Sequence, residues 1–385
     1  MSGRPVLTRM LAAILCGLAL FLPGFPGKSE VSAPQSRLLA IGCDQFLTMP
    51  ATASASANNA RAMARLFRDC VPTGETCVVR ENGSGSVAEL DSLVRETFGQ
   101  ATEQDTSWFY LSTHGIIWEE QEKTHMALLL CDGQREEAME ADALRRILDQ
   151  IPGRKILILD ACHTGAMIGE GIPGGINLFE SGAYTVLCSS GGSEESWLWL
   201  DERSGGMGYF TSALESALTQ SLPEQIDPDG NGLVTLPELK ARLTEIHGAS
   251  TVLAWSQEEN IPLFRLPAER PPATGILGLR FEATEREDHS LVQRFRFTVE
   301  TPVRLIYELV QREDDRWDFD GAAYLRDRER AGAARGSLSP GEKDRKVRIS
   351  EDTLGEDGVA LLVIFGQRKD GRTVPEGSRI LKLPE

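Results

Sequence analysis

Residues 155–165 read KILILDACHTG, and residues 107–115 read SWFYLSTHG. Each segment is a continuous apolar run that ends in a reactive side chain, Cys162 in the first and His114 in the second, with a glycine shortly after it. Continuous apolar strands are typical of a parallel sheet that is covered on both faces. We therefore expect two strands of one such sheet. Cys162 and His114 then lie at the carboxyl ends, where parallel sheets bind ligands.

The sequence around these strands alternates between strand and helix patterns, which predicts an α/β domain over 34–267 with a mostly parallel sheet flanked by helices. The expected strands are 37–43, 76–81, 107–115, 155–165 and 183–192, and 125–133 adds a hairpin. The expected helices are 56–70, 87–101, 140–151, 208–222 and 238–248. A Pro-rich break follows at 266–273. Strand patterns at 294–300, 303–310, 359–368 and 379–384 then predict a smaller, sandwich-like all-β domain over 274–385.

Composition narrows the classes of partner. The chain has 57 acidic and 40 basic residues and a formal charge of −17, a surface that repels phosphate backbones, so nucleic acid is not an expected partner. Arg4 and Arg9 precede an uncharged apolar run that is shorter than the ~20 residues a membrane span needs. Residues 1–33 are therefore predicted to be a signal peptide of an exported protein, secreted or periplasmic, with no stable membrane span.

The six cysteines that follow the predicted signal peptide fall into three groups. Cys70 and Cys77 are close together in a polar stretch, where an exported protein could form a small disulfide. Three others border apolar runs, which is typical of small buried side chains: Cys43, Cys131 and Cys188. Cys162 remains as the candidate nucleophile.

A cysteine nucleophile needs an imidazole within reach, and the chain has five histidines. Three lie in polar or helical surroundings, which indicates solvated surface positions: His125, His247 and His289. His163 adjoins Cys162, but neighbouring strand residues point to opposite faces. His114 is therefore the candidate base. Gly115 lets its N–H approach a ligand closely, and with the N–H of Cys162 it could form an oxyanion hole.

The spacing of His114 and Cys162 alone would also fit two strand ends without catalytic function. The two motifs together, however, resemble the caspase–metacaspase family of cysteine peptidases. YLSTHG at 110–115 and LILDACHTG at 157–165 carry the resemblance, and ANNARAMARLF at 57–67 and GYFTSAL at 208–214 extend it over 37–266. The resemblance implies a caspase-like fold and hydrolysis of protein or peptide substrates by a Cys162–His114 dyad. The alternative is a binding or scaffold protein that kept the fold and lost catalysis. A serine hydrolase is disfavoured because no G-x-S-x-G elbow is present.

Asp160 is the candidate substrate-binding residue. It stands two residues before Cys162, so on a strand the two side chains share a face. A carboxylate there favours a cationic side chain, and arginine can meet it with two hydrogen bonds. Caspases have Gln at this position, so Asp160 is more similar to metacaspases, although Asn59 stands where those commonly carry an acid. We expect cleavage after Arg or Lys; alternatively, Asp160 only orients the catalytic loop.

The positions of Lys and Arg indicate where the chain could cut itself. Residues 163–184 contain no Lys or Arg, which predicts an active single chain, with Arg203 as the expected internal cut if one occurs.

The segment DPDGNGLVTLPE places six oxygen donors at the spacing of an EF-hand calcium loop: Asp227, Asp229, Asn231, the Leu233 carbonyl, Thr235 and Glu238. Metacaspase-like enzymes are often calcium-dependent, so Ca²⁺ is the expected cofactor, and no organic cofactor is expected. A turn that caps the next helix is the alternative, because Pro223 interrupts the entering helix.

Overall fold

The computed structural model describes residues 33–72, 74–120, 123–181, 183–200, 205–258, 260–267, 275–313, 316–325, 337–367 and 371–383. Residues 34–385 form one compact unit. The first 32 residues of the predicted signal peptide, the predicted cut at Arg203 and most of the Pro-rich break lie outside the described residues. Within the described ranges, no helix is both long and apolar enough to cross a membrane.

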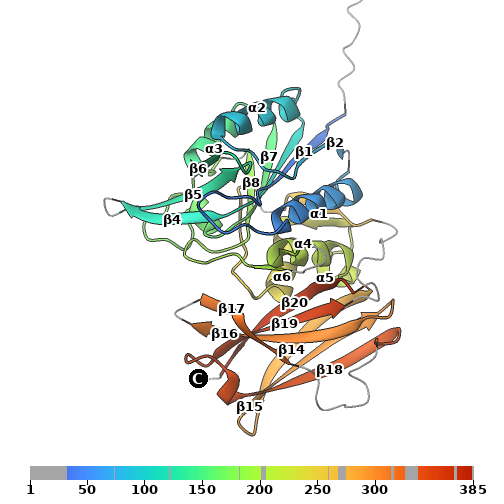
Figure 1. The fold of residues 1–385 in the computed structure, drawn as a ribbon. Coiled ribbons are helices and arrows are strands. Elements are labelled where there is room, and N and C mark those ends of the chain that lie inside the picture. Colours follow the sequence, from blue (N-terminus) through green and yellow to red (C-terminus); the bar gives the residue numbers. More distant parts are fainter. Residues whose placement is uncertain are drawn as a thin grey trace, which may run out of the picture. The chain divides into compact units, whose positions relative to one another are not determined.

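A six-stranded sheet organises the N-terminal part of this unit, with strand order β12-β8-β7-β3-β1-β2 (Figure 1). Its strands are β1 (Ser36–Gly42), β2 (Gly74–Arg80), β3 (Thr106–Ser112), β7 (Arg154–Asp160), β8 (Tyr184–Cys188) and β12 (Leu253–Ser256). All neighbouring pairs are parallel except β12 with β8. The predicted mostly parallel sheet is confirmed.

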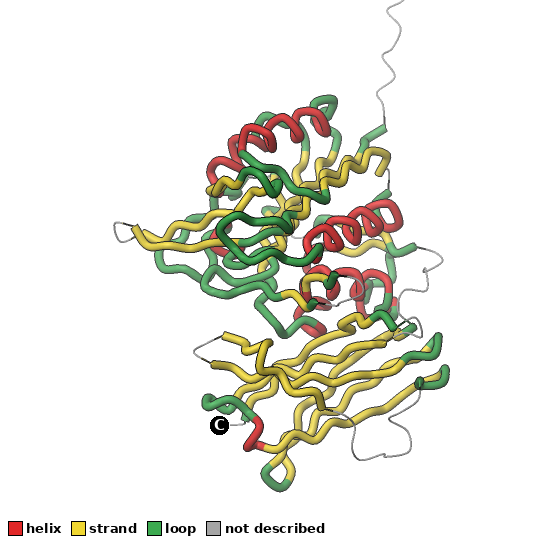
Figure 2. The backbone as a smooth tube through the Cα atoms, viewed as in Figure 1, coloured by secondary structure: helices red, strands yellow, loops and turns green. Residues whose placement is uncertain are grey.

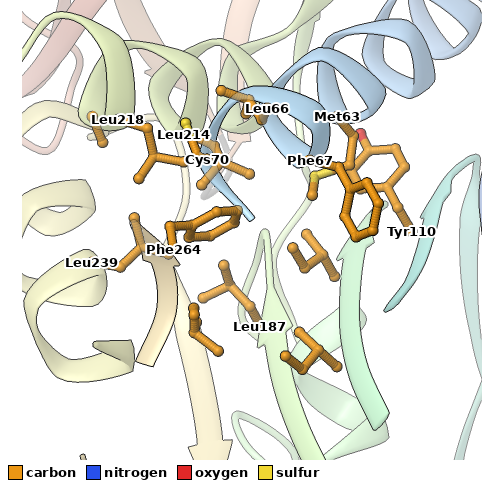
Figure 3. Packing of buried hydrophobic residues seen from close by; sticks show 14 of the residues in the cluster. Met63, Leu66, Phe67, Cys70, Tyr110, Leu187, Leu214, Leu218, Leu239 and Phe264 are labelled. Atoms are coloured by element: carbon orange, nitrogen blue, oxygen red, sulfur yellow. The ribbon is translucent and has the colours of Figure 1, made fainter. Parts of the chain in front are cut away.

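Helices cover both faces of this sheet (Figure 2). One face packs against α1 (Ala55–Cys70), α4 (Tyr209–Thr219) and α6 (Leu236–Ile246), and the other against α2 (Val87–Phe98) and α3 (Ala141–Leu148). Figure 3 shows the first of these cores, which contains Phe67 of α1, Leu214 of α4 and Leu187 of β8. A serine begins α2 in the usual way, since Ser86 accepts a hydrogen bond from the Glu89 N–H.

Burial on both faces explains why the strands read as unbroken apolar runs. Successive strand residues point to opposite faces. In β1, Leu38 and Ala40 join the core under α1, whereas Leu39 and Ile41 join the core under α2. All four of these positions are fully buried, so no polar alternation remains among them.

A hairpin extends from the end of β3. The strands β4 (Gly115–Glu120), β5 (Lys123–Cys131) and β6 (Glu136–Glu140) form a separate antiparallel sheet. The hairpin predicted at 125–133 is therefore confirmed.

The C-terminal strands form two antiparallel sheets that share one core. The first sheet contains β14 (Ile276–Glu287), β15 (Ser290–Val299) and β18 (Gly341–Ser350). The second contains β16 (Arg304–Glu313), β17 (Arg316–Leu325), β19 (Val359–Gln367) and β20 (Thr373–Lys382). Phe295 of the first sheet and Leu362 of the second lie in the same buried cluster. This face-to-face arrangement is the expected sandwich.

Two sequence expectations are wrong. Cys70 and Cys77 are free thiols, because Cys70 is the last residue of α1, buried in the core of Figure 3, and Cys77 lies within β2 rather than in an exposed loop. His247 is only 5% exposed, because it follows α6 and its ring meets the Phe210 ring with centroids 6.2 Å apart. Cys43, Cys131 and Cys188 are buried as predicted.

Candidate active site

Strand register brings the candidate nucleophile and base to one edge of the sheet. Ser112 of β3 is the partner of Asp160 in the neighbouring parallel strand β7, and His114 and Cys162 each lie two residues beyond these partners. The Thr113 N–H donates to the Asp160 carbonyl at 3.2 Å, which continues the ladder past the strand ends. His114 and Cys162 therefore emerge at the same carboxyl edge.

Gly115 packs directly against the backbone of Cys162. A Cβ atom at residue 115 would lie 1.9 Å from the Cys162 carbonyl oxygen and 3.3 Å from its nitrogen. Only glycine permits this approach. The Gly115 N–H also donates to the Cys162 thiol. One backbone donor thus points at the position where the thiol would attack a carbonyl group.

The Cys162 thiol is half-buried and lies against the backbone of Ser196. The Ser196 N–H is 3.4 Å from Sγ, and the Ser196 carbonyl is 3.6 Å from it. Burial raises the pKa of Cys162 to about 11, the carboxylates of Glu195 and Asp160 add to this rise, and the N–H groups of Ser196 and Gly115 oppose it. In this state the thiol is protonated at neutral pH and needs a base.

The His114 ring is held by the segment that follows β1. Its Nε2 lies 2.9 Å from the Pro50 carbonyl, and the Phe46 ring packs against it with centroids 4.4 Å apart. A carbonyl oxygen can only accept, so Nε2 carries the proton and Nδ1 of the neutral ring carries the lone pair. No hydrogen bond joins His114 to Cys162 among the residues that the structure describes. The ring is thus in the tautomer of a base.

The loop that provides Pro50 and Phe46 is tied down on both sides. The Asp44 carboxylate accepts the Ala57 N–H at 2.9 Å, at the beginning of α1. Glu136 of β6 accepts the Leu47 N–H at 2.6 Å. These bonds fix the segment 43–50, which holds the imidazole.

Asp160 is buried, with 5% of its surface exposed, on the face of the sheet that α1 and α4 cover. Its Oδ2 accepts from Thr211 Oγ1 at 2.6 Å and from Asn59 Nδ2 at 3.2 Å, and its Oδ1 accepts from Ser196 Oγ at 3.1 Å. Burial raises the pKa of Asp160, and the donated hydrogen bonds counteract this. No ion pair within the described ranges involves Asp160. The carboxylate is thus buried among neutral donors.

The short hairpin beyond Ser196 connects the site to the C-terminal sandwich. It consists of β9 (Leu198–Trp199) and β10 (Met207–Gly208). The Trp199 ring meets the Tyr209 ring at 5.9 Å, and the Tyr209 ring meets the Phe365 ring of β19 at 6.3 Å. The Tyr209 N–H also donates to the Trp197 carbonyl at 2.9 Å. The hairpin next to the Cys162 thiol is therefore connected, through the Tyr209 ring, to Phe365 of the sandwich.

The candidate calcium loop connects the short helix α5 (Pro223–Ile226) to α6. It gathers the carboxylates of Asp227, Asp229 and Glu238 within 4.8 Å of one another. All the side-chain donors take part in the loop's own hydrogen bonds: Asp227 accepts the Gly232 N–H at 2.8 Å, Asp229 accepts the Asn231 N–H at 3.1 Å, Asn231 Oδ1 accepts the Leu233 N–H at 2.7 Å, and the Thr235 hydroxyl donates to Glu238 at 2.6 Å. The acidic donors have the chemistry that Ca²⁺ prefers. Thr235 and Glu238 also form the capping box of α6, which the turn alternative requires.

Sequence reasoning missed four residues of the site: Phe46, Pro50, Ser196 and Thr211. Thr211 lies in the segment GYFTSAL, one of the motifs that carried the resemblance. Phe46, Pro50 and Ser196 lie in loops, and they act through a ring face, a carbonyl and a backbone N–H. The Pro50 carbonyl and the Ser196 N–H are backbone groups, which leave no mark on residue type, and nothing in the sequence pairs the Phe46 ring with His114.

A match to a protein family agrees with this architecture. The caspase domain family matches residues 35–244, more than half of the chain. A Geobacter sulfurreducens protein has 13% sequence identity, with 61% of this chain and 100% of that chain covered and a TM-score of 0.43. Caspase-1 from Spodoptera frugiperda has 12% identity, with 58% and 88% covered and a TM-score of 0.38. No curated protein matches the chain. On the extent of the family match, the chain belongs to the caspase domain family, whose members are cysteine peptidases that act on proteins.

Proposed function

We propose that the protein is a cysteine endopeptidase in which Cys162 is the nucleophile and His114 the base. The observation that carries this proposal is the register of β3 and β7, which puts both side chains two residues beyond a paired position. The family match and the close approach of Gly115 to Cys162 support it. A thiol, an imidazole and aligned N–H groups are the parts that acyl transfer needs.

The proposed reaction proceeds through a thioester. His114 Nδ1 takes the proton of the Cys162 thiol as sulfur attacks the scissile carbonyl. The N–H groups of Gly115 and Cys162 stabilise the oxyanion. His114 then gives its proton to the leaving amine, and water hydrolyses the acyl-enzyme by the reverse sequence. The Pro50 carbonyl keeps the imidazole oriented, because it accepts from Nε2–H throughout.

For substrate choice, we propose that Asp160 selects arginine or lysine on the acyl side of the cleaved bond. Oδ2 already accepts from Thr211 and Asn59, whereas Oδ1 accepts from Ser196, which itself contacts Cys162. A guanidinium that enters beside the thiol meets a carboxylate without a competing ion pair in the described part of the chain. An aspartate there would instead be repelled.

Two further proposals concern metal and location. The carboxylates of Asp227, Asp229 and Glu238 would hold a Ca²⁺ ion, with Asn231, Thr235 and the Leu233 carbonyl completing the set, and their convergence within 4.8 Å supports this. The ion would fix the connection between α5 and α6.

We also propose that the protein is exported from the cytoplasm. The apolar run before residue 34, which Arg4 and Arg9 precede, supports this.

Loss of activity in two variants tests the peptidase proposal. Residues 34–385 should cleave peptides and be alkylated by iodoacetamide at Cys162. Cys162→Ala and His114→Ala should each lower kcat/KM by about 10³-fold or more, since the two residues act as one unit. Cys188→Ala, which changes a buried thiol elsewhere in the core, is the matched control and should stay active. Turnover that survives in Cys162→Ala would reject the assignment, and an inert wild type would favour the scaffold alternative.

A further inference from the structure

Two buried cysteines face each other beside the segment that holds His114. Cys43 directly follows β1 and is 0% exposed, and Cys131 is the last residue of β5 and is 1% exposed. Gly83 lies next to both residues: a Cβ atom added to it would be 2.8 Å from Cys43 Sγ and 2.0 Å from the Cys131 carbonyl oxygen. The two thiols are hydrogen-bonded to each other, and the Cys131 N–H also donates to the Cys43 sulfur. Both are free thiols in this structure, and their side chains interact.

The surroundings of the pair connect it to the candidate active site. The Thr113 hydroxyl, next to His114 in the chain, interacts with Cys43. The Gln45 N–H interacts with the Cys131 sulfur, one residue before Phe46, whose ring packs on His114. A covalent bond between the two sulfurs would therefore join the start of the segment 43–50 to β5.

We propose that Cys43 and Cys131 form a disulfide when the chain folds in contact with a low-molecular-weight disulfide such as oxidised glutathione. Each protein thiol loses one proton, the two sulfurs together lose two electrons, and the S–S bond of glutathione takes them up to give two glutathione thiols. The first step is attack by a protein thiolate to form a mixed disulfide, and the second protein thiol then displaces glutathione.

The contact between the two thiols changes the acidity of both in the folded protein. The hydrogen bond from the Cys131 thiol lowers the pKa of Cys43, and the same contact raises the pKa of Cys131. Because both sulfurs are covered in the folded protein, the disulfide forms during folding rather than afterwards. This proposal does not depend on peptidase activity.

Peptide mapping after oxidative refolding tests the proposal. Residues 34–385, which form one compact unit with six cysteines, are refolded with reduced and oxidised glutathione, and free thiols are then alkylated in denaturant. Without reduction, trypsin should release fragment 38–61, which contains Cys43, linked to fragment 124–135, which contains Cys131. The count of free thiols should fall by two. A Cys70–Cys77 disulfide is distinguishable, because both residues lie within the single fragment 69–80.

Matched variants and thermal unfolding complete the test. The linked fragments should disappear in Cys43→Ala and persist in Cys188→Ala. Reduction should lower the unfolding midpoint of the oxidised wild type by about 5 °C or more, because the disulfide closes a long loop, and it should leave Cys43→Ala unchanged. Recovery of all six thiols after oxidative refolding, or a link between other fragments, would overturn the proposal. The wild-type map decides even if the alanine variants fail to fold.

Discussion

Gly115 and Cys162 are in such close contact that a Cβ atom at residue 115 would lie 1.9 Å from the Cys162 carbonyl oxygen. A side chain at residue 115 would clash at this separation, so Gly115, the first residue of β4, can pack against Cys162, two residues beyond the end of β7, only because it is glycine. The N–H of Gly115 also interacts with the Cys162 thiol and lowers its pKa.

Gly115→Ala should therefore lower peptidase activity by about 10²-fold or more, since the added methyl group moves an oxyanion donor away from the thiol. Peptide hydrolysis measures kcat/KM. Ile116→Ala changes the next residue of β4, which is only half-buried, and should keep most of the activity. Similar losses in both variants would show that β4 is merely sensitive to substitution.

Asp160→Asn should reduce the preference for arginine over neutral residues at the cleaved bond. Asparagine keeps the shape and part of the hydrogen bonding to Thr211 and Ser196, but it removes the charge that attracts a guanidinium. A peptide library that varies the residue before the cleaved bond measures the preference in both proteins. An unchanged preference for basic residues, or strong cleavage after aspartate, would exclude this pocket.

The sequence predicted the parts of this protein that depend on buried side chains. β1, β3, β7 and β8 were recognisable because burial on both faces leaves continuous apolar runs, and Cys162 and His114 stood out at the ends of two of them. The parts that were not predicted depend on backbone groups. Pro50 acts through its carbonyl, and no residue pattern reveals which loop a distant histidine will meet.

Burial that depends on the tertiary structure accounts for the errors. His247 follows a helix in a polar stretch, but the packing of α4 covers its ring. Cys70 and Cys77 look like a pair in a loop, but one ends a helix and the other lies in a strand. Local composition carries no information about which surface a neighbouring element will cover.

Substitution of Asp229 and Glu238 by alanine together should weaken calcium binding, because it removes two of the three carboxylates that converge within 4.8 Å. Calorimetric titration with CaCl₂ measures the dissociation constant. Glu96→Ala with Asp142→Ala removes two acids from other surface positions and should leave binding unchanged. Identical titrations of the wild type and the loop variant would assign the loop to helix capping alone.

Acid should destabilise the protein through His247. Burial lowers the pKa of His247 to about 4, below the ordinary value near 6.5, although Glu194 partly opposes this. The unfolded chain then binds the extra proton more readily, so stability is lost as pH falls from about 6.5 towards 4, by about 3 kcal/mol in total. Denaturant unfolding at a series of pH values measures this loss. His247→Gln should flatten the slope in that window; an equal slope in both proteins would assign the effect to other groups.

The contact between Tyr209 and Phe365 predicts that the C-terminal sandwich sets the affinity for substrate. The Phe365 ring packs against the Tyr209 ring. Tyr209 in turn contacts Trp199 through its ring and Trp197 through its N–H. Trp197 directly follows Ser196, which contacts the Cys162 thiol. Phe365→Leu leaves a gap under this hairpin, and we expect KM to rise by roughly 5-fold while kcat changes little, because binding rather than chemistry is disturbed.

Phe297→Leu provides the matched control. Phe297 is also 4% exposed, but it lies in the core between the two sandwich sheets and has no ring contact with Tyr209. Both substitutions remove similar buried apolar surface, so each should cost about 1–2 kcal/mol of stability. If KM rises only in Phe365→Leu, the effect travels through the hairpin. If KM rises equally in both variants, general loosening of the sandwich explains it and the hairpin plays no special part.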